Sequence, residues 1–436
     1  MLSLFGLFVG LAILIYLTVR GVDLLFAAPL CALLVALTSN FALFPQTATP
    51  GMPAFSTAYM SGFVNFIQTW FFMFLLGSLF GKIMEASGGA NSVADWIVRH
   101  LGARHAVLAV VLACAVLTYG GVSLFVVAFA VYPMAVSLFR VADLPRRFIP
   151  GALAFGSVTF TMTSAGSPEI QNWIPIQYLH TTPYAAAFES FVVAVAMAIG
   201  GFLILHWMVR RAVSAGERFE SRSNDPILEQ RELPAMWRGA IPLLCVLIVS
   251  FVYHDTLRES ALIIALGSGV LAGCILNLKF LRGRVSLAVS SGAMGALVAI
   301  ANTAAVVGFG SVAKLTPGFQ SAVDAMTQIP GDPLVGAAVA VSVIAGLTGS
   351  ASGGQSIALP ILAPHYLDVG VNPEALHRVV AISSGALDSL PHNGYVVTTL
   401  RGICKESYAD AYPAVGILTV MVPALGTALA IALLSF

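Results

Sequence analysis

The chain has 436 residues, of which 58% are hydrophobic and only 9% are charged. Soluble domains carry about 25% charged residues, so the composition excludes an ordinary soluble protein and indicates an all-α polytopic membrane protein. The formal net charge of +1 gives no sign of a nucleic-acid partner. Five cysteines are scattered in apolar sequence without a Cys-x-x-Cys pair, so neither a disulfide framework nor a metal site is predicted.

Runs of about 17–25 apolar residues predict membrane-spanning helices. The first run has no basic leader or cleavage site, so we expect it to be retained. Two predicted spans are interrupted by polar residues and proline, near Gly166–Pro168 and near Pro391. The predicted spans are 4–19, 23–37, 62–84, 148–179 and 184–209, then 239–253, 261–276, 289–312, 379–401 and 411–434.

Two further stretches, 106–140 and 334–367, each join two apolar arms through a polar, glycine-rich tip. The tips are Thr118–Ser123 and Thr348–Gly354. Small polar residues at membrane depth are costly unless they line a cavity or a site. Glycine and serine are also poor material for an exposed turn between two complete spans. We therefore predict re-entrant helical hairpins, with fully spanning pairs as the alternative.

The two halves of the sequence repeat the same order of parts. Ser87–Asp95 aligns with Thr316–Asp324, and Thr118 aligns with Thr348. This predicts a first repeat (1–212), a cytoplasmic linker (213–236) and a second repeat (237–436), each repeat with five spans and one hairpin. An odd number of spans inverts the second repeat and brings the hairpins in from opposite faces. The short segments 92–100 and 321–328 are expected to lie in the membrane interface, with Ser92 and Ser321 as N-cap candidates.

The distribution of basic residues gives the predicted orientation. With the N-terminus outside, all but three of the 21 Lys and Arg residues fall on the inner side, as the positive-inside rule requires. The three exceptions are Arg258, Lys314 and Arg378. A bacterial inner-membrane location with both termini in the periplasm is therefore predicted. His365 and His377 are expected at the outer surface, and Arg146-Arg147 is expected to anchor the inner side.

The breaks and tips form a candidate anion site. A broken helix leaves free N–H groups that carry partial positive charge and attract a carboxylate, and hydroxyls add donors. The alternative role of these small residues is close helix packing. The breaks contain no Lys or Arg, which favours a small monoanion over a tricarboxylate. The candidate binding residues are Gly120, Gly121, Ser123, Ser164, Gly166, Ser167, Ser350, Ser352, Gly353, Gly354, Ser389, His392 and Asn393.

Three ionisable residues lie at or beside the breaks and are candidates for carrying a coupled proton: Asp388, His392 and Glu169. Each has an alternative role. Asp388 is placed to cap the half-helix after the break, Glu169 to face solvent past Pro168, and His392 to donate to the substrate. No nucleophile–base set, Walker loop or dinucleotide motif is present, so an enzyme and an ATP-driven pump are not predicted.

The run Leu376–Gly394, with its Asp-Ser-Leu-Pro-His-Asn-Gly sequence, and Ser350–Gly354 resemble the gluconate permease family of the ion-transporter superfamily. Gly121–Pro133 and Phe160–Thr163 are most similar to its D-β-hydroxybutyrate permease-like branch. The resemblance implies a homodimeric, proton-coupled importer of small organic acids. It also implies an elevator mechanism, in which a moving domain carries the hairpins along a scaffold domain.

The chain departs from gluconate-type members at its first hairpin and first break, which counts against gluconate itself. We therefore predict a secondary transporter that imports a hydroxybutyrate-like monocarboxylate or small dicarboxylate in symport with protons. One alternative is a sodium-coupled, citrate-like di- or tricarboxylate transporter. A passive anion channel is another. No cofactor beyond the coupling ion is expected, and the partners are the organic anion, membrane lipid and a second copy of the chain.

Overall fold

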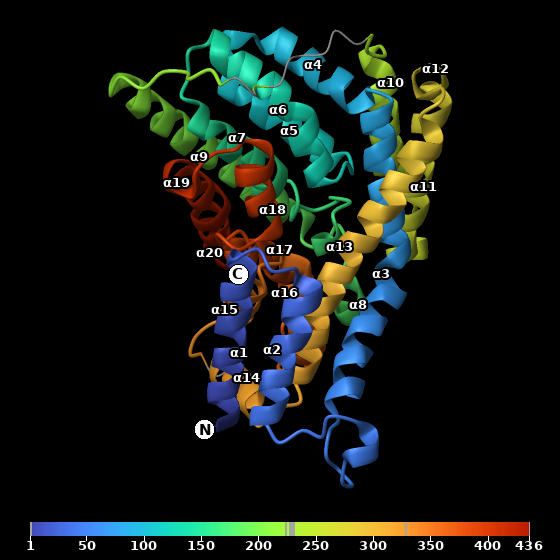
Figure 1. The fold of residues 1–436 in the computed structure, drawn as a ribbon, viewed down its shortest axis with the longest axis vertical. Helices are drawn as coiled ribbons and strands as arrows, with labels where there is room; N and C mark the ends of the chain where they lie inside the picture. The colour runs from blue at the N-terminus through green and yellow to red at the C-terminus, as the bar shows by residue number, and fades with distance from the viewer. Residues whose placement is uncertain (1, 223–224, 226–231, 328, 436) are drawn as a thin grey trace.

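The computed structural model describes residues 2–222, 225, 232–327 and 329–435, and its described residues are almost entirely helical (Figure 1). Gln328, the last residue of the second expected interfacial segment, lies outside the described residues, as do parts of the expected linker. The first half contains α1 (Leu2–Val19), α2 (Leu24–Thr38), α3 (Phe55–Ala86), α4 (Gly89–Leu101), α5 (Ala106–Tyr119), α6 (Leu124–Val141), α7 (Ile149–Ala154), α8 (Ile176–Leu179) and α9 (Ala187–Ser214).

The second half repeats this order with small additions. It contains α10 (Met236–Leu257), α11 (Glu259–Leu276), α12 (Leu278–Leu281), α13 (Val285–Ala313), α14 (Pro317–Thr327), α15 (Pro333–Thr348), α16 (Ala351–Asp368), α17 (Pro373–Leu387), α18 (Gly394–Val397), α19 (Tyr408–Gly416) and α20 (Val422–Leu434). Three π-helical segments, Phe155–Thr159, Thr398–Ile403 and Ile417–Met421, follow α7, α18 and α19. The first two lie beside the two breaks, and π-helical turns are frequent at functional sites.

Six stretches of the described chain are long and apolar enough to cross a membrane: α3, α6, α9, α10, α13 and Tyr408–Leu434. A seventh candidate is the pair Gly89–Leu101 and Ala103–Tyr119, which bends by 101° and is either a broken span or a re-entrant loop. The apolar helices α1, α2, α11 and α15 are shorter. A 15-residue helix is about 22 Å long, less than a hydrocarbon core of about 30 Å. Length alone therefore supports fewer spans than the ten that the apolar runs predict.

Helices α3 and α13 occupy matching places in the two halves, pack along their length and run in opposite directions (Figure 1). Small residues bring them together: a Cβ on Gly62 would lie 2.0 Å from the Ser311 hydroxyl oxygen. The Tyr59 hydroxyl donates to the Ala305 carbonyl oxygen at 3.1 Å. Helix α2 packs on α13 and α11 packs on α3, while α1 packs on α2 and α10 packs on α11. We name these six helices the α3–α13 group.

The remaining long elements pack with one another: α5, α6, α7 and α9 from the first half, and α15, α16, α17, α19 and α20 from the second. We name them the hairpin group. Helices α4 and α14 lie at opposite ends of the molecule (Figure 1). The pairs α5/α6 and α15/α16 are antiparallel contacts joined by four- and two-residue connections.

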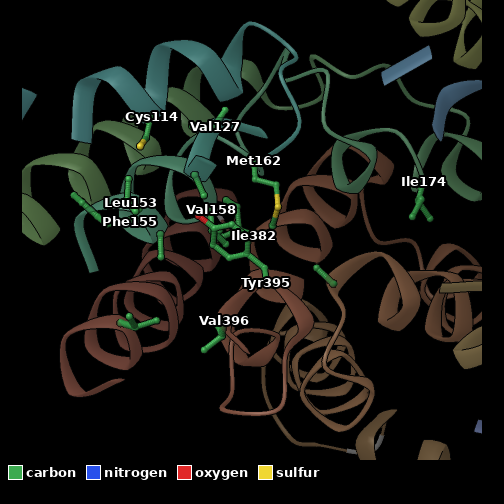
Figure 2. Close-up of a cluster of buried hydrophobic side chains, with 14 of the residues drawn as sticks. Cys114, Val127, Leu153, Phe155, Val158, Met162, Ile174, Ile382, Tyr395 and Val396 are labelled. Atoms are coloured by element: carbon green, nitrogen blue, oxygen red, sulfur yellow. The ribbon is translucent and has the colours of Figure 1, made fainter. Parts of the chain in front are cut away.

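A buried apolar cluster connects the two halves within the hairpin group (Figure 2). Cys114 and Val127 come from the first hairpin, while Val158 and Met162 come from the π-helical segment and loop after α7. Tyr395 enters the cluster from α18, and its ring lies edge-on to Phe125 with 5.6 Å between centroids. Burial of this kind stabilises by about 25 cal/mol per Å² of apolar surface, so the cluster holds the two breaks together.

Two expected helix caps differ from the structure. Helix α4 begins at Gly89 after Gly88, whose φ is +77°. Ser92 lies inside the helix, where its hydroxyl donates to the Gly89 carbonyl oxygen. Helix α14 begins at Pro317, and the Thr316 side chain accepts from the Phe319 amide at 3.2 Å. The predicted N-caps at Ser92 and Ser321 are therefore wrong, because the helices start several residues earlier.

Candidate functional site

The second tip and the second break lie against each other. Helix α15 ends at Thr348 and is capped by Gly349, which adopts the left-handed conformation with φ +61°. The Asn393 side-chain amide donates to the Gly349 carbonyl oxygen at 3.0 Å. Ser350 then starts α16, where its hydroxyl accepts from the Gly353 amide at 3.1 Å and contacts the Ser352 hydroxyl at 3.3 Å. The polar residues of this tip therefore form a helix N-terminus directly beside the break.

Asp388 closes α17, and its side chain is only 5% exposed. Its carboxylate accepts from the Ser389 hydroxyl at 2.8 Å and lies next to the backbone of Ala351, the first residue of α16. The N-terminus of a helix attracts negative charge, so this position suits a carboxylate. The cap of the half-helix after the break is Asn393, whose Oδ1 accepts from the Val396 amide at 3.0 Å. The capping alternative proposed for Asp388 therefore belongs to Asn393.

His392 lies between the tip and the break and is 5% exposed. A Cβ on Gly349 would lie 2.9 Å from the His392 Nε2 atom, so the imidazole sits directly over the tip. Among the described residues, Nε2 has no hydrogen-bond partner. A buried polar atom without a partner is costly unless something else satisfies it. This nitrogen therefore remains free for a water, a proton or a ligand.

The first tip and the first break also meet. The Tyr119 hydroxyl, at the end of α5, donates to the Ala165 carbonyl oxygen at 2.6 Å. Ser164 donates back to the Thr161 carbonyl oxygen. The Ser167 carbonyl oxygen accepts from the Asn172 side chain at 3.2 Å and from the Trp173 indole at 2.9 Å. The break is thus held in one shape by its own polar groups.

The remaining candidates of the first half are two half-buried polar residues and two closely packed glycines. Ser123 and Glu169 are half-buried, and Ser123 stands at the start of α6. Gly120 and Gly121 pack on α10, since a Cβ on Gly120 would lie 2.8 Å from Leu243 and one on Gly121 would lie 3.2 Å from Val246. For these two glycines the close-packing role is the one that the contacts support.

Three other candidate glycines also make close contacts. Gly166 has φ +76° and would place a Cβ 2.6 Å from the Tyr184 ring, so a side chain would be strained there for both reasons. Gly354 lies against Ala345 of the same hairpin, where a Cβ would be 2.5 Å from the Ala345 Cα atom. Gly353 would meet Ser350 at 3.3 Å. Gly354 therefore lets two backbones approach within the hairpin, whereas Gly166 and Gly353 make room for neighbouring side chains.

Two buried residues of α17 were not predicted as part of the site. His377 and Arg378 are both 0% exposed, so their expected position at the outer surface is wrong. His377 Nδ1 lies 2.6 Å from the Thr181 hydroxyl, and Arg378 donates to the segment 163–185 of the first half. His365 is exposed, as expected. Arg378 therefore brings to the first break the positive charge that the break sequences lack, and the absence of Lys and Arg from those sequences no longer favours a monoanion.

Several other buried polar atoms around the tips and breaks have no hydrogen-bond partner among the described residues. They come from the first tip, the first break and its flanks, the second hairpin and the segment after the second break. These atoms are Thr118 Oγ1, Ser157 Oγ, Thr163 Oγ1, Gln171 Oε1, Gln355 Oε1, Ser356 Oγ, Tyr395 OH and Thr399 Oγ1. A buried polar atom without a partner is costly unless water or a ligand satisfies it, so these atoms add to the case for the candidate site.

A cluster of charged side chains lies at the end of the hairpin group where the linker begins. Arg146 is buried and donates to Asp225 at 2.8 Å and to Glu406 at 2.9 Å. Arg222 bonds the other oxygen of Glu406 at 3.0 Å, and Arg147 bonds Glu217 at 2.7 Å. Arg146 therefore does more than anchor one side of the membrane, because it joins the first hairpin, the linker and the second half.

The family is decided by comparison with known proteins. Residues 8–311 match the family model described as citrate transporter. The chain belongs to the citrate transporter family. This family lies in the ion-transporter superfamily, which the sequence motifs also indicated. Within that superfamily, the comparison gives the citrate transporter family and not the gluconate permease family that the motifs resemble.

Two relatives support the assignment over most of the chain. The uncharacterized transporter YxjC of Bacillus subtilis is 35% identical over 457 residues, covering 94% of this chain and 95% of the relative. An uncharacterized transporter of Haemophilus influenzae is 24% identical over 348 residues, covering 79% of this chain and 80% of the relative. The protein is therefore a multi-pass membrane transporter and not an enzyme.

Two solved structures share the fold. The YdaH transporter of Alcanivorax borkumensis superposes with a TM-score of 0.56 at 15% identity, covering 95% of this chain and 98% of that one. MtrF of Neisseria gonorrhoeae, described as belonging to a class of antimetabolite efflux pumps, superposes with a TM-score of 0.52 at 14% identity. The match covers 96% of this chain and 94% of that one. At these identities the likeness establishes the all-helical transporter fold with its bent or re-entrant helix pair.

Proposed function

We propose that the protein is a secondary active transporter for a small organic acid anion, with a citrate-like di- or tricarboxylate as the first substrate class to test. The observation that carries this proposal is the pairing of each hairpin tip with the break of its own half. Each pair is surrounded by buried polar atoms that lack partners. Membership of the citrate transporter family and the buried Arg378 both favour a multiply charged anion over a hydroxybutyrate-like monocarboxylate.

The two groups of helices suggest how transport proceeds. The hairpin group contains both tip–break pairs, and the α3–α13 group lies along one side of it. We propose that these groups are the moving and the fixed parts of an elevator. The antiparallel course of α3 and α13 supports inverted repeats (Figure 1), in which equivalent elements of the two halves exchange roles between the outward and inward states.

Coupling to protons rests on Asp388 and His392, the two buried ionisable groups at the second break. Asp388 accepts from the Ser389 hydroxyl and lies against the Ala351 backbone, but it has no ion-pair partner among the described residues, and His392 has an unpartnered nitrogen. Both are therefore placed to change protonation when a ligand arrives. Glu169, half-buried in the first break, is the third proposed proton carrier, and sodium is the alternative coupling ion.

The test is uptake of radiolabelled citrate into proteoliposomes. Under an inward proton gradient at fixed membrane potential, accumulation of citrate above the external concentration is the expected result. Malate, succinate and 3-hydroxybutyrate serve as competitors that rank the substrate classes. Uptake that follows a sodium gradient and ignores pH would contradict proton coupling. Flux that only equilibrates citrate under every gradient would instead indicate a passive channel.

We also propose a homodimer and periplasmic termini. The α3–α13 group exposes many large apolar residues, such as Phe72, Leu271 and Met294, which need lipid or a second copy of the chain. Mass photometry of the purified protein measures the oligomeric state. Labelling of single cysteines at Ser3 and Ser435 in whole cells with a membrane-impermeant maleimide tests the orientation of the termini.

A further inference from the structure

Arg378 is a fully buried cation whose five N–H donors are all used. Its Nε donates to the Ala185 carbonyl oxygen at 3.0 Å, and Nη2 donates to Ala185 at 2.9 Å and Pro183 at 3.2 Å. Its Nη1 donates to the Thr163 carbonyl oxygen at 2.8 Å and to Asn172 Oδ1 at 2.9 Å. Every acceptor belongs to the first break and the loop that follows it. The guanidinium of the second half therefore fixes the shape of the first break.

The acceptors satisfy the hydrogen bonds of Arg378, but none of them carries a negative charge. All are neutral, being three backbone carbonyls and one side-chain amide. Glu374 is nearby on the same helix but is exposed to solvent, and among the described residues no ion pair includes Arg378. A buried charge without an opposite charge is costly. An anion bound at the break would remove that cost.

The position of the guanidinium fits this role. Thr163 opens the first break, and its Oγ1 atom is buried without a partner. His377, adjacent to Arg378, has an unpartnered Nε2 atom. The hydroxyl of Tyr119 at the first tip bonds Ala165, two residues beyond Thr163. Asp388 lies ten residues further along the chain, about 15 Å at the rise of an α-helix. Helix α17 thus carries positive charge at the first break and negative charge at the second.

We propose that Arg378 is the fixed positive charge of the anion site. Because all its N–H donors are occupied by the first break, Arg378 attracts the anion through its charge and not through hydrogen bonds. It therefore raises affinity most for anions of high charge. This inference rests on the proposed transport of an organic acid. It assigns Arg378 as a positioning and specificity-determining residue, and it accounts for a multiply charged substrate despite breaks that contain no Lys or Arg.

The experiment separates charge from hydrogen bonding with four variants of the full-length protein. R378Q removes the positive charge. N172D cancels it, since Asn172 Oδ1 already faces Nη1 at 2.9 Å. R378K and N172L keep the charge but lose hydrogen bonds. Both Asn172 variants lose the bonds from Asn172 Nδ2 to the Ser167 and Pro183 carbonyl oxygens, so they are matched in that respect. N65D, at an exposed position of α3, adds a negative charge elsewhere.

Citrate and 3-hydroxybutyrate are titrated against each purified protein, and binding is followed by the melting temperature. We expect citrate affinity within about threefold of wild type for N65D and at least tenfold weaker for R378Q and N172D, with a clearly smaller loss for R378K and N172L, which keep the positive charge. The loss for 3-hydroxybutyrate should be smaller than for citrate, as Coulomb attraction scales with charge. If affinity instead follows the loss of thermal stability, with R378K as weak as R378Q, Arg378 has only a structural role and the proposal is overturned.

A second experiment distinguishes failure of the proposed substrate class from failure of the proposed role of Arg378. If neither citrate nor 3-hydroxybutyrate stabilises the wild-type protein, the proposed substrate class fails, and sulfate then serves as the anion. Replacing chloride by sulfate at constant ionic strength should raise the melting temperature of wild type, R378K and N172L more than that of R378Q and N172D. An equal response of all five proteins would overturn the role of Arg378 as well.

Discussion

The side-chain amide of Asn393 donates a hydrogen bond to the carbonyl of Gly349 across 3.0 Å, while its Oδ1 atom caps α18. One side chain therefore shapes the half-helix after the second break and holds the second tip against it. The two functions use different atoms of the same amide. Substitutions can consequently separate the local helix cap from the contact between tip and break.

The pair N393D and N393A tests that separation. The aspartate keeps an oxygen that can accept from the Val396 amide but loses the donor to Gly349, so we expect weaker substrate binding with little loss of thermal stability. The alanine loses both, and loss of a cap costs about 1 kcal/mol. Thermal melting and citrate titration measure the two effects. Equal citrate affinity in N393D and wild type would show that the tip contact does not shape the site.

The second break should carry the coupling chemistry. We expect D388N or H392A to lose uptake driven by a pH gradient while keeping counterflow exchange of citrate, because exchange needs binding and movement but no net proton transfer. E169Q, at the half-buried carboxylate of the first break, is measured beside them to test whether the third proposed proton carrier is needed as well. If gradient-driven uptake and counterflow fall together in D388N and H392A, these residues bind the substrate and do not carry the proton.

Relative movement of the two groups is tested with engineered disulfides. A Cβ on Gly81 of α3 would lie 3.7 Å from the Ser123 Cβ atom, within the usual Cβ separation of about 3.5–4.5 Å for a disulfide. G81C/S123C links the α3–α13 group to the first tip, so its oxidation should stop transport and reduction should restore it. The five native cysteines are replaced beforehand.

The matched control links two parts of the hairpin group. A Cβ on Gly385 of α17 would lie 3.7 Å from the Thr163 Cγ2 atom, so T163C/G385C joins the first break to the second half. We expect its oxidation to leave most transport intact, since both residues should move together. Transport that survives in oxidised G81C/S123C would contradict an elevator.

The charged cluster at the linker should lose its stabilising effect on the fold in acid. Burial alone would raise the pKa of Asp225, but hydrogen bonds from the Arg222 amide and from Arg146 and Arg140 lower it below its ordinary value of 3.8. A carboxylate with a lowered pKa stabilises the fold above its ordinary pKa. That contribution disappears as the pH falls through the pKa of the folded protein.

The D225N variant measures this contribution. We expect D225N to be less stable than wild type by about 1–3 kcal/mol at pH 7, the usual effect of losing charge-assisted hydrogen bonds. The difference should shrink only below the ordinary pKa of 3.8, where the unfolded chain binds a proton at this carboxyl while the folded protein still keeps it ionised. Melting curves of both proteins between pH 3 and pH 7 test this. A deficit that stays constant down to pH 3 would show that Asp225 gains nothing from its charge.

The tips and breaks could be predicted because clustered glycine, serine and proline at membrane depth expose backbone polar groups that lipid cannot satisfy. Helices α5/α6 and α15/α16 lie over the two stretches singled out by their polar tips. His377 and Arg378 could not be placed in the same way. An Arg close after Asn372-Pro373 has the local pattern of an outer loop, and charge counting treats it as a topology marker.

What buries Arg378 is a set of carbonyl oxygens in the segment 163–185, far away in the sequence. Any residue type presents a backbone carbonyl, so no side-chain pattern reveals such acceptors. The resemblance led to the right superfamily but to a different family within it, because it rested on short motifs. The short run ending in Asp388–Gly394 resembles gluconate permeases, whereas the match to citrate transporters extends over residues 8–311 and does not include that run.

The contact between α3 and α13 also governs when the protein can fold during synthesis. Helix α3 ends at Ala86, and α13 starts at Val285, so roughly 200 residues must be made before α3 meets its partner. At about 5–20 residues per second this takes roughly 10–40 s. Until then the surface around Gly62, against which Ser311 packs in the finished protein, faces lipid or the insertion machinery. The first half therefore waits for the second, and a ribosome stalled within the linker would leave a nascent chain without its central helix pair.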